Sequence, residues 1–182
     1  LGWLHFTGKV IRRDEEEAAR LIRKAADQGH ARARIVVALM LDGGRGGEVD
    51  NLAATRFLQK AAEEDVALAQ LMLARRYRVG RGVERDYAKA VEWFRKAEKQ
   101  GEVEAKHELG NAYLDGNGVT RDYVEAVRWY RSAAESGLPA AQSKLGFMYW
   151  KGFGVRQDDH EALRWFRLAE KKGVAEAEFF IG

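Results

Sequence analysis

An internal repeat constrains the fold of this chain more than any other feature of its sequence. The stretch GNGVTRDYVEAVRWYRSAAESG at residues 116–137 recurs as GRGVERDYAKAVEWFRKAEKQG at 80–101 and as GFGVRQDDHEALRWFRLAEKKG at 152–173. The starting positions 80, 116 and 152 lie 36 residues apart. A fixed period of about 20–50 residues predicts a solenoid, in which each unit buries its apolar face by stacking on its neighbours.

The period holds along the whole chain without insertions. Five glycines and five aspartates follow it, namely Gly8, Gly44, Gly80, Gly116 and Gly152, with Asp14, Asp50, Asp86, Asp122 and Asp158. The resulting units are a partial repeat at 1–30, full repeats at 31–66, 67–102, 103–138 and 139–174, and a partial repeat at 175–182. We expect one repeat domain over 1–182. Leu1 and Gly182 both fall inside a helix of the unit, so we expect the chain to be a piece of a longer array.

The first half of each repeat has the pattern of a helix, which we name helix A. In repeat 103–138, Ala105, Leu109 and Tyr113 recur every four residues and form one apolar stripe that ends at Gly116. The glycine marks the turn that follows.

The second half of each repeat predicts another helix, helix B. Asp122 offers a carboxylate to the free amides at its start, and Glu125 three residues later completes a capping-box pattern. The helix ends near Gly137, where a left-handed cap favours glycine.

Residues on the period therefore receive structural roles. The glycines turn the chain, the aspartates cap helix B, and the tryptophans, with the Phe or Tyr that follows each, fill the gaps between layers. These structural residues are Gly80, Gly82, Asp86 and Trp93; Gly116, Gly118, Asp122 and Trp129; and Gly152, Gly154, Asp158 and Trp165. Repeat 31–66 departs from the pattern, with Phe57 for the tryptophan and Asp65 for the capping glycine, so we expect local softness there.

The segments LGNAYLDGNGVTRDYVEAVRWYRSAAESG (109–137) and LGFMYWKGFGVRQDDHEALRWFRLAEKKG (145–173) resemble the Sel-one-like repeat family, a relative of the tetratricopeptide repeats. The resemblance covers essentially the whole chain, with departures at His5, Ala38 and Leu41. It implies an all-α fold, a right-handed α/α superhelical solenoid of 36-residue helix-turn-helix repeats. It also implies a scaffold or adaptor for protein complexes, often bacterial, without a shared catalytic residue.

Composition restricts the remaining classes of function. The chain has no cysteine, which leaves no thiolate ligands and fits either a bacterial cytoplasm or a periplasm. No apolar run approaches the roughly 20 residues of a membrane-spanning helix. The formal charge of +3 comes from 31 basic and 28 acidic residues mixed along the chain, which is weak support for a nucleic-acid partner.

Two motifs resemble ligand-binding sites in their residue types. The GxG turns resemble phosphate-binding loops, but they follow a helix rather than a strand and Asp122 occupies the helix start that a phosphate would need. In the RWYR cluster, Trp129 and Tyr130 belong to the core rows, which disfavours a platform for nucleic-acid bases. The four histidines lack a paired spacing, so we expect no catalytic residue, no cofactor and no metal site.

Positions that vary between repeats are the candidates for recognition. They lie on the helix A face turned away from helix B, which lines the concave groove of such an array. The predicted groove residues are Arg32, Leu39, Leu71, Arg75, Arg78, His107, Asn111, Phe147 and Trp150. We hypothesise that a peptide or protein contacts Arg75, Arg78, Phe147 and Trp150; in the alternative interpretation, the two aromatic residues pack against neighbouring A helices.

Several functions are compatible with such a groove. The first is a non-catalytic scaffold for a protein or peptide partner, and a narrower version is an inhibitor or immunity protein that blocks a bacterial toxin or enzyme. RNA binding and glycan binding by the groove are further alternatives. Open ends of the array, which carry Phe179 and Phe180, also suggest self-association.

Overall fold

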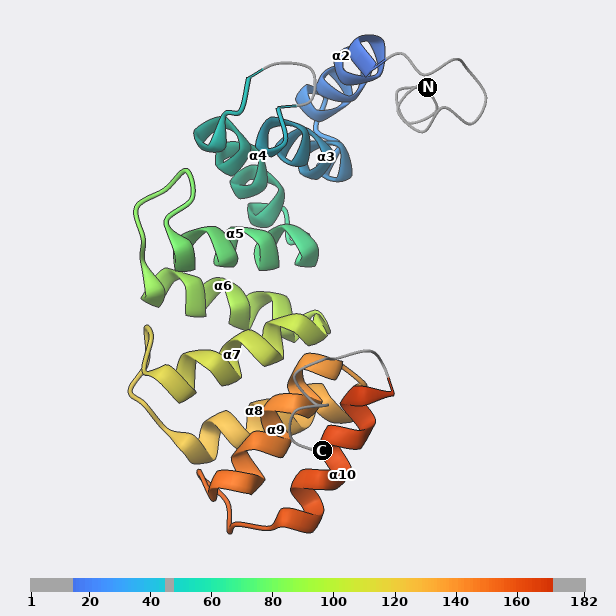
Figure 1. Ribbon diagram of the computed structural model, residues 1–182. Helices are drawn as coiled ribbons and strands as arrows, with labels where there is room; N and C mark the ends of the chain where they lie inside the picture. The colour runs from blue at the N-terminus through green and yellow to red at the C-terminus, as the bar shows by residue number, and fades with distance from the viewer. Residues whose placement is uncertain (1–14, 45–47, 172–182) are drawn as a thin grey trace. The chain divides into compact units, whose positions relative to one another are not determined.

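The structure, a computed structural model, describes residues 15–44 and 48–171 (Figure 1). The described residues form α-helices joined by short turns, without a strand among them. The helices are α2 (Glu15–Asp27), α3 (Ala31–Asp42), α4 (Asn51–Glu63), α5 (Ala67–Val79), α6 (Tyr87–Lys99), α7 (Val103–Asp115), α8 (Tyr123–Glu135), α9 (Pro139–Lys151) and α10 (Asp159–Glu170). Helices A of the repeats are α3, α5, α7 and α9. Expectations for Gly8, Asp14 and the partial repeat at 175–182 lie outside the described residues.

The chain divides into two compact units. Unit 1 spans Leu1–Asp86 and contains α2 to α5, and unit 2 spans Tyr87–Gly182 and contains α6 to α10. Within each unit, every helix packs against the helix that follows it in the sequence. Each unit therefore has the alternating helix A and helix B arrangement that the period predicts.

In the last three full repeats, the first glycine of the turn between helices A and B ends helix A in a left-handed conformation. Gly80, Gly116 and Gly152 have φ angles of +77°, +76° and +68°. The turn is then closed by a bond to the capping aspartate of helix B: the backbone N–H of Asp122 donates to the carbonyl of Tyr113 at 2.9 Å. Asp50, Asp86 and Asp158 repeat this bond.

The aspartate side chain caps helix B as the sequence predicts, but the capping box is only half formed. Asp122 Oδ1 accepts hydrogen bonds from the backbone of Val124 and Glu125 at 2.9 and 3.1 Å. The reciprocal bond from Glu125 is absent because the N–H of Asp122 already donates to Tyr113. Glu125 instead pairs with Arg128 at 2.9 Å, so the prediction of a complete capping box was wrong.

In the three full repeats whose turn is described completely, the second glycine of the turn contacts the preceding repeat. A Cβ atom at Gly118 would lie 2.2 Å from the carbonyl oxygen of Tyr87, and one at Gly154 would lie 2.2 Å from that of Tyr123. These oxygens belong to the first residues of α6 and α8. The turn of one repeat thus lies directly on the backbone at the start of the preceding helix B.

Inside each repeat, a small residue on helix A faces a large one on helix B. A Cβ at Gly110 would lie 2.6 Å from the ring of Tyr130, and one at Gly146 would lie 2.9 Å from the ring of Phe166. Both rings are fully buried. In repeat 31–66 the equivalent positions hold Ala38 and Leu58, both buried, so a larger helix A residue accompanies a smaller partner.

The tryptophan row is less central than the row beside it. Trp165 is buried, whereas Trp93 and Trp129 are half-buried. A basic side chain covers each ring, as Lys96 does at 4.0 Å from the centroid of Trp93. The tryptophans therefore lie at the edge of the core, and the Phe or Tyr that follows each of them lies at its centre.

Repeat 31–66 keeps the same turn geometry without the capping glycine. Asp65 adopts φ +58°, a left-handed conformation that aspartate tolerates better than most residues. The N–H of Val66 donates to Ala61, as that of Leu138 does to Ala133 in repeat 103–138. Gln70 also donates to Asp65 Oδ1 at 3.2 Å, which ties the next helix A to this turn.

Unit 1 contains a buried polar network that the repeat pattern did not reveal. The guanidinium of Arg76 is 5% exposed and forms an ion pair with Asp42. It also donates to Thr55 Oγ1 at 2.9 Å and to the carbonyl of Asn51 at 3.2 Å. The network joins repeats 31–66 and 67–102 by hydrogen bonds. The position of Arg76 is occupied by the buried residues Met40 and Met148 in two other repeats.

The contact between repeats predicts unequal costs for two glycine substitutions. Gly101→Ala strains a residue at φ +91° but meets no atom within 4 Å, so we expect it to lower the free energy of unfolding by about 1–2 kcal/mol. Gly118→Ala adds the overlap with Tyr87, and we expect an additional cost of about 1–3 kcal/mol. Urea unfolding measures both variants, and equal costs would contradict the proposed contact.

The Arg76 network predicts a rescue by a second substitution. Arg76→Met leaves the carboxylate of Asp42, which is 15% exposed, without its main partner, and we expect a loss of about 3 kcal/mol. Adding Asp42→Leu removes that charge, so we expect the double variant to be at least about 1 kcal/mol more stable than Arg76→Met alone. Thermal and urea unfolding test this order, and a double variant that is less stable than Arg76→Met would refute it.

Candidate functional site

Four aromatic residues of unit 2 form a contiguous surface cluster, which we name the aromatic patch: Tyr123, Phe147, Trp150 and Phe153. Tyr123 and Phe153 are stacked, with centroids 5.0 Å apart and an angle of 11° between their planes. Phe147 meets Trp150 at 6.0 Å and Phe153 at 6.2 Å, both edge to face. Trp150 and Phe153 are 37% and 36% exposed, so the patch reaches the solvent.

The repeat geometry explains why these rings meet. Phe147 and Trp150 are three residues apart on α9 and therefore share a face. Phe153 lies between the two left-handed glycines of the next turn, and Gly154 holds that turn against the first residue of α8, which is Tyr123. The contact between repeats thus brings Phe153 onto Tyr123, and the patch combines repeats 103–138 and 139–174.

Two cations border the aromatic patch. Lys151 Nζ lies 3.6 Å from the centroid of the Trp150 ring, and the guanidinium carbon of Arg121 lies 5.7 Å from that of Tyr123. Both side chains are exposed, and neither forms an ion pair with a carboxylate among residues 15–44 and 48–171. Within the described ranges, the border of the patch therefore presents positive charge that no carboxylate pairs with.

A polar cluster lies on α7 in the same unit. Tyr130 donates its hydroxyl to Asn111 Oδ1 at 2.7 Å, and the amide of Asn111 lies 3.5 Å from His107 Nδ1 and 3.4 Å from Glu108 Oε2. Burial is the main cause that raises the pKa of Tyr130 far above its ordinary 10.0, and the negative charges of Asp115 and Glu108 raise it further. The cluster fixes the orientation of Asn111, a predicted groove residue.

The predicted groove residues of unit 2 have different surroundings. Phe147 and Trp150 contact each other, and Phe147 also packs against the core around Leu145 and Met148. His107 and Asn111 are half-buried in the polar cluster. The sequence therefore identified the α9 part of the aromatic patch but missed Tyr123 and Phe153.

In unit 1 the predicted groove residues are only partly accessible. Arg32, Leu39 and Arg78 are exposed, and Arg75 is half-buried. Leu71 is 3% exposed and lies in the core, so its prediction as a groove residue was wrong. Leu71 shares its side of α5 both with Arg75 and with the buried Ala74, so the helical period alone did not separate core from groove at this position. The four residues of the hypothesis divide between the units, Arg75 and Arg78 in unit 1 and Phe147 and Trp150 in unit 2.

The sequence did contain a signal for the missed residue Phe153. The position between the two turn glycines holds Arg81, Asn117 and Phe153 in successive repeats, and such variation marks a residue that the fold does not fix. Phe153 lies outside helix A, in a turn whose glycines have a structural role, and the prediction of groove residues from helix A did not include it.

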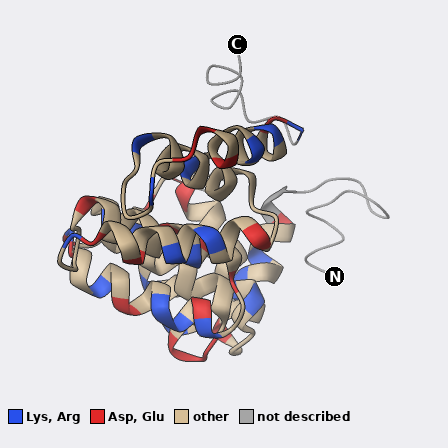
Figure 2. Ribbon diagram, turned by 90° about the horizontal axis from the view of Figure 1, so that it is seen from below, with Lys and Arg blue, Asp and Glu red and all other residues tan. Residues whose placement is uncertain are grey.

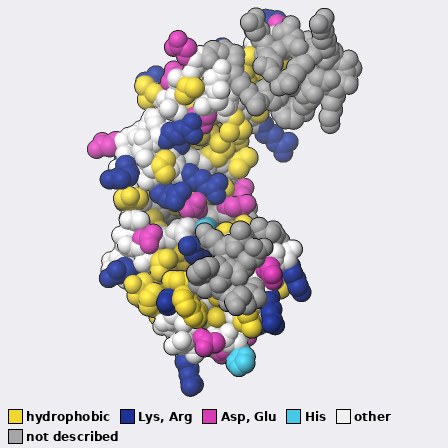
Figure 3. Space-filling view, viewed as in Figure 1, with side chains coloured by type: hydrophobic (Ala, Val, Ile, Leu, Met, Phe, Trp, Pro, Cys, Tyr) yellow, Lys and Arg dark blue, Asp and Glu magenta, His cyan; other side chains and the backbone are white. Residues whose placement is uncertain are grey.

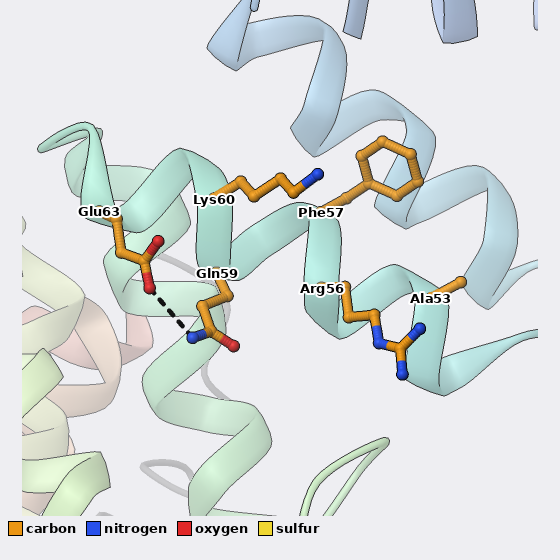
Figure 4. A pocket seen from close by; sticks show the side chains of 6 residues that line it. All are labelled: Ala53, Arg56, Phe57, Gln59, Lys60 and Glu63. Atoms are coloured by element: carbon orange, nitrogen blue, oxygen red, sulfur yellow. Dashed lines mark hydrogen bonds between the residues drawn. The ribbon is translucent and has the colours of Figure 1, made fainter. Parts of the chain in front are cut away.

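Other surface features lack comparable chemistry. Figure 4 shows a shallow depression on α4, where Lys60 and Phe57 extend side by side and Gln59 donates to Glu63 at 3.0 Å. Phe57 packs against the core cluster of α2 and α3, at the position that holds tryptophan in the other repeats. Phe57 is thus one of the residues that line the depression.

Charge and apolar surface are distributed differently over the molecule. Figure 2 shows basic and acidic residues interspersed along the helices, and Figure 3 shows hydrophobic side chains gathered over α8 and α9 of unit 2. Across the described ranges, no three His, Asp or Glu side chains are grouped as a metal site would require. No described helix has both the length and the apolar character needed to cross a bilayer.

Comparisons with known proteins agree with the repeat architecture. The family model described as Sel1 repeat matches residues 1–30, 31–66, 67–102, 103–138 and 139–174. A crystal structure of a protective antigen present in uropathogenic Escherichia coli, which displays an SLR fold, is 36% identical with a TM-score of 0.95. That match covers 100% of this chain and 39% of the antigen, so the chain spans about two fifths of that protein.

Two further structures are similar. A Sel1 repeat protein from Oxalobacter formigenes is 32% identical with a TM-score of 0.92, over 97% of this chain and 72% of that protein. An immunity protein from Pseudomonas aeruginosa shares the fold at 21% identity and a TM-score of 0.63, over 98% of this chain and 67% of that protein. A comparison with curated proteins gave no match. The predicted all-α solenoid of 36-residue helix-turn-helix repeats is confirmed.

The pKa shift of Tyr130 predicts a stability change at high pH. Above pH 10 the unfolded chain releases the phenol proton of Tyr130, whereas the native state retains it. The contribution of Tyr130 to the free energy of unfolding is therefore fully present below pH 10 and is lost as the pH rises further. We expect Tyr130→Phe to be about 1 kcal/mol less stable than the native sequence near neutral pH, because the bond to Asn111 is lost. By about pH 11 that deficit should shrink by roughly 1 kcal/mol.

Urea unfolding of both proteins at about pH 8 and about pH 11 measures this difference. The other tyrosines titrate equally in both proteins and cancel. A deficit that stays constant across this range would show that Tyr130 has an ordinary pKa.

Proposed function

Because the chain belongs to the Sel1 repeat family, we propose that it is a non-catalytic scaffold or adaptor that binds a protein or peptide through the helix A faces of its repeats. Proteins of this family are generally scaffolds for protein interactions. The aromatic patch is the observation that supports the proposal most directly. Its four rings form a connected cluster that reaches the surface, although the contact between repeats uses only the backbone of Tyr123.

Energetic considerations favour protein recognition at such a surface. Trp, Tyr and Arg are the residues that most often dominate binding between proteins. The rings are held by the contact between two repeats rather than by a long loop, so little conformational entropy is lost when a partner binds.

Inhibition of a bacterial toxin or enzyme is a special case of the same proposal. The fold shared with the Pseudomonas aeruginosa immunity protein raises this possibility, and the identity of the captured partner decides it. An enzyme whose activity falls on stoichiometric addition of this chain would support inhibition. A partner without such an effect would support the scaffold role.

Affinity capture with quantitative mass spectrometry tests the proposed function. Trp150→Ala combined with Phe153→Ala removes the exposed rings, and we expect at least about 10-fold less of a captured partner than with the native sequence. Arg75→Glu tests the unit 1 part of the groove separately. Leu52→Ala serves as the control, because Leu52 is 54% exposed on helix B of unit 1.

All variants are first checked for a native circular dichroism spectrum and melting temperature. If every partner is captured equally by the native sequence, by the aromatic double variant and by Arg75→Glu, the helix A faces do not carry the function.

A further inference from the structure

We propose that the aromatic patch, with Arg121 and Lys151 at its border, is a docking site for an acidic protein segment that carries a large apolar side chain. This inference rests on the proposed function and specifies the chemistry of the partner. It concerns unit 2 alone.

The apolar part of the site comes from the four rings. Single exposed apolar residues are ordinary on protein surfaces, but contiguous apolar clusters mark sites of interaction. Trp150 and Phe153 each expose more than a third of their surface, and Phe147 joins them edge to face. Val124, which is 64% exposed, follows Tyr123 directly in the sequence. A leucine or an aromatic side chain of a partner would bury this surface.

The charge of the border selects an acidic partner. Lys151 and Arg121 are held over the rings of Trp150 and Tyr123, so their cations are already placed at the patch. The nearby carboxylates of Asp122 and Asp158 accept hydrogen bonds from helix amides, and Glu125 pairs with Arg128. A carboxylate from a partner would therefore find donors that no described acidic residue uses.

The arrangement of the rings favours a protein segment over a nucleic acid. Bases bind by stacking on free aromatic faces. Here Phe153 covers one face of Tyr123, and Lys151 covers one face of Trp150. Phe147 meets both Trp150 and Phe153 in edge-to-face contacts. The remaining surface suits an aliphatic or aromatic side chain that inserts between rings, with a carboxylate beside it.

Selection from a random 12-residue peptide library displayed on phage tests the proposal with the full chain as target. We expect enriched peptides to combine acidic residues with Trp, Phe or Leu. Synthetic copies of the enriched peptides are then measured by fluorescence anisotropy at low and high salt. We expect affinity to fall about 10-fold or more for the variant with Trp150→Ala and Phe153→Ala.

Charge reversal separates this site from general electrostatic attraction. We expect the variant with Arg121→Glu and Lys151→Glu to bind the acidic peptides about 10-fold more weakly than the native sequence. The affinity of this variant should also depend less on salt concentration. Lys96→Glu is the matched control, because Lys96 lies over Trp93 as Lys151 lies over Trp150, and it should leave affinity within about 2-fold. These surface variants also remain informative if the aromatic double variant fails to fold.

Each outcome is decisive for the proposal. Peptides that are basic or neutral, or that bind the charge-reversed variant equally, would overturn it. Single-stranded oligonucleotides that bind in place of peptides, and that the acidic peptides do not displace, would overturn it in favour of RNA. Failure to enrich any peptide would also overturn this proposal. The proposed function would still stand if a protein were captured by the native sequence and lost with Arg75→Glu. Loss of both capture and selection would remove both proposals.

Discussion

The structure depends on the close approach of the fully described turns to the backbone that begins the preceding helix B. Gly118 and Gly154 lie so near to the carbonyls of Tyr87 and Tyr123 that a Cβ atom has no room. The first glycine of the turn supplies the left-handed conformation, and the second supplies the contact between repeats. Stacking of repeats is thus specified by backbone geometry, while the buried side chains supply most of the hydrophobic stabilisation.

This contact also determines which surface positions can gain a function. The residue between the two glycines is held at the junction of two repeats and differs between repeats; as Arg81 it donates to Asn51 Oδ1 of the preceding repeat at 2.8 Å. In repeat 139–174 it is Phe153, which meets Tyr123, and the aromatic patch is the result. A scaffold of this kind can change its recognition surface without changing its core.

Departures from the repeat are the places where chemistry concentrates. Arg76 occupies a core position where two other repeats carry methionine, and it needs Asp42, Asn51 and Thr55 to satisfy its guanidinium. Asn111 occupies a groove position, and Tyr130 adds the one hydroxyl to a row of phenylalanines in unit 2. Each network depends on a residue that one full repeat alone carries at its position, Arg76 in the first and Asn111 in the second, so the networks distinguish positions along an otherwise regular array.

The sequence by itself determined the helices, the 36-residue units and the roles of Gly116 and Asp122, because these follow from local backbone chemistry repeated in phase. It also indicated Phe147 and Trp150 as variable residues. Tertiary structure alone decided that Leu71 is buried, that Glu125 pairs with Arg128 rather than with Asp122, and that Tyr123 and Phe153 complete the patch. These outcomes depend on atoms brought together from different helices and repeats, which a one-dimensional period cannot place.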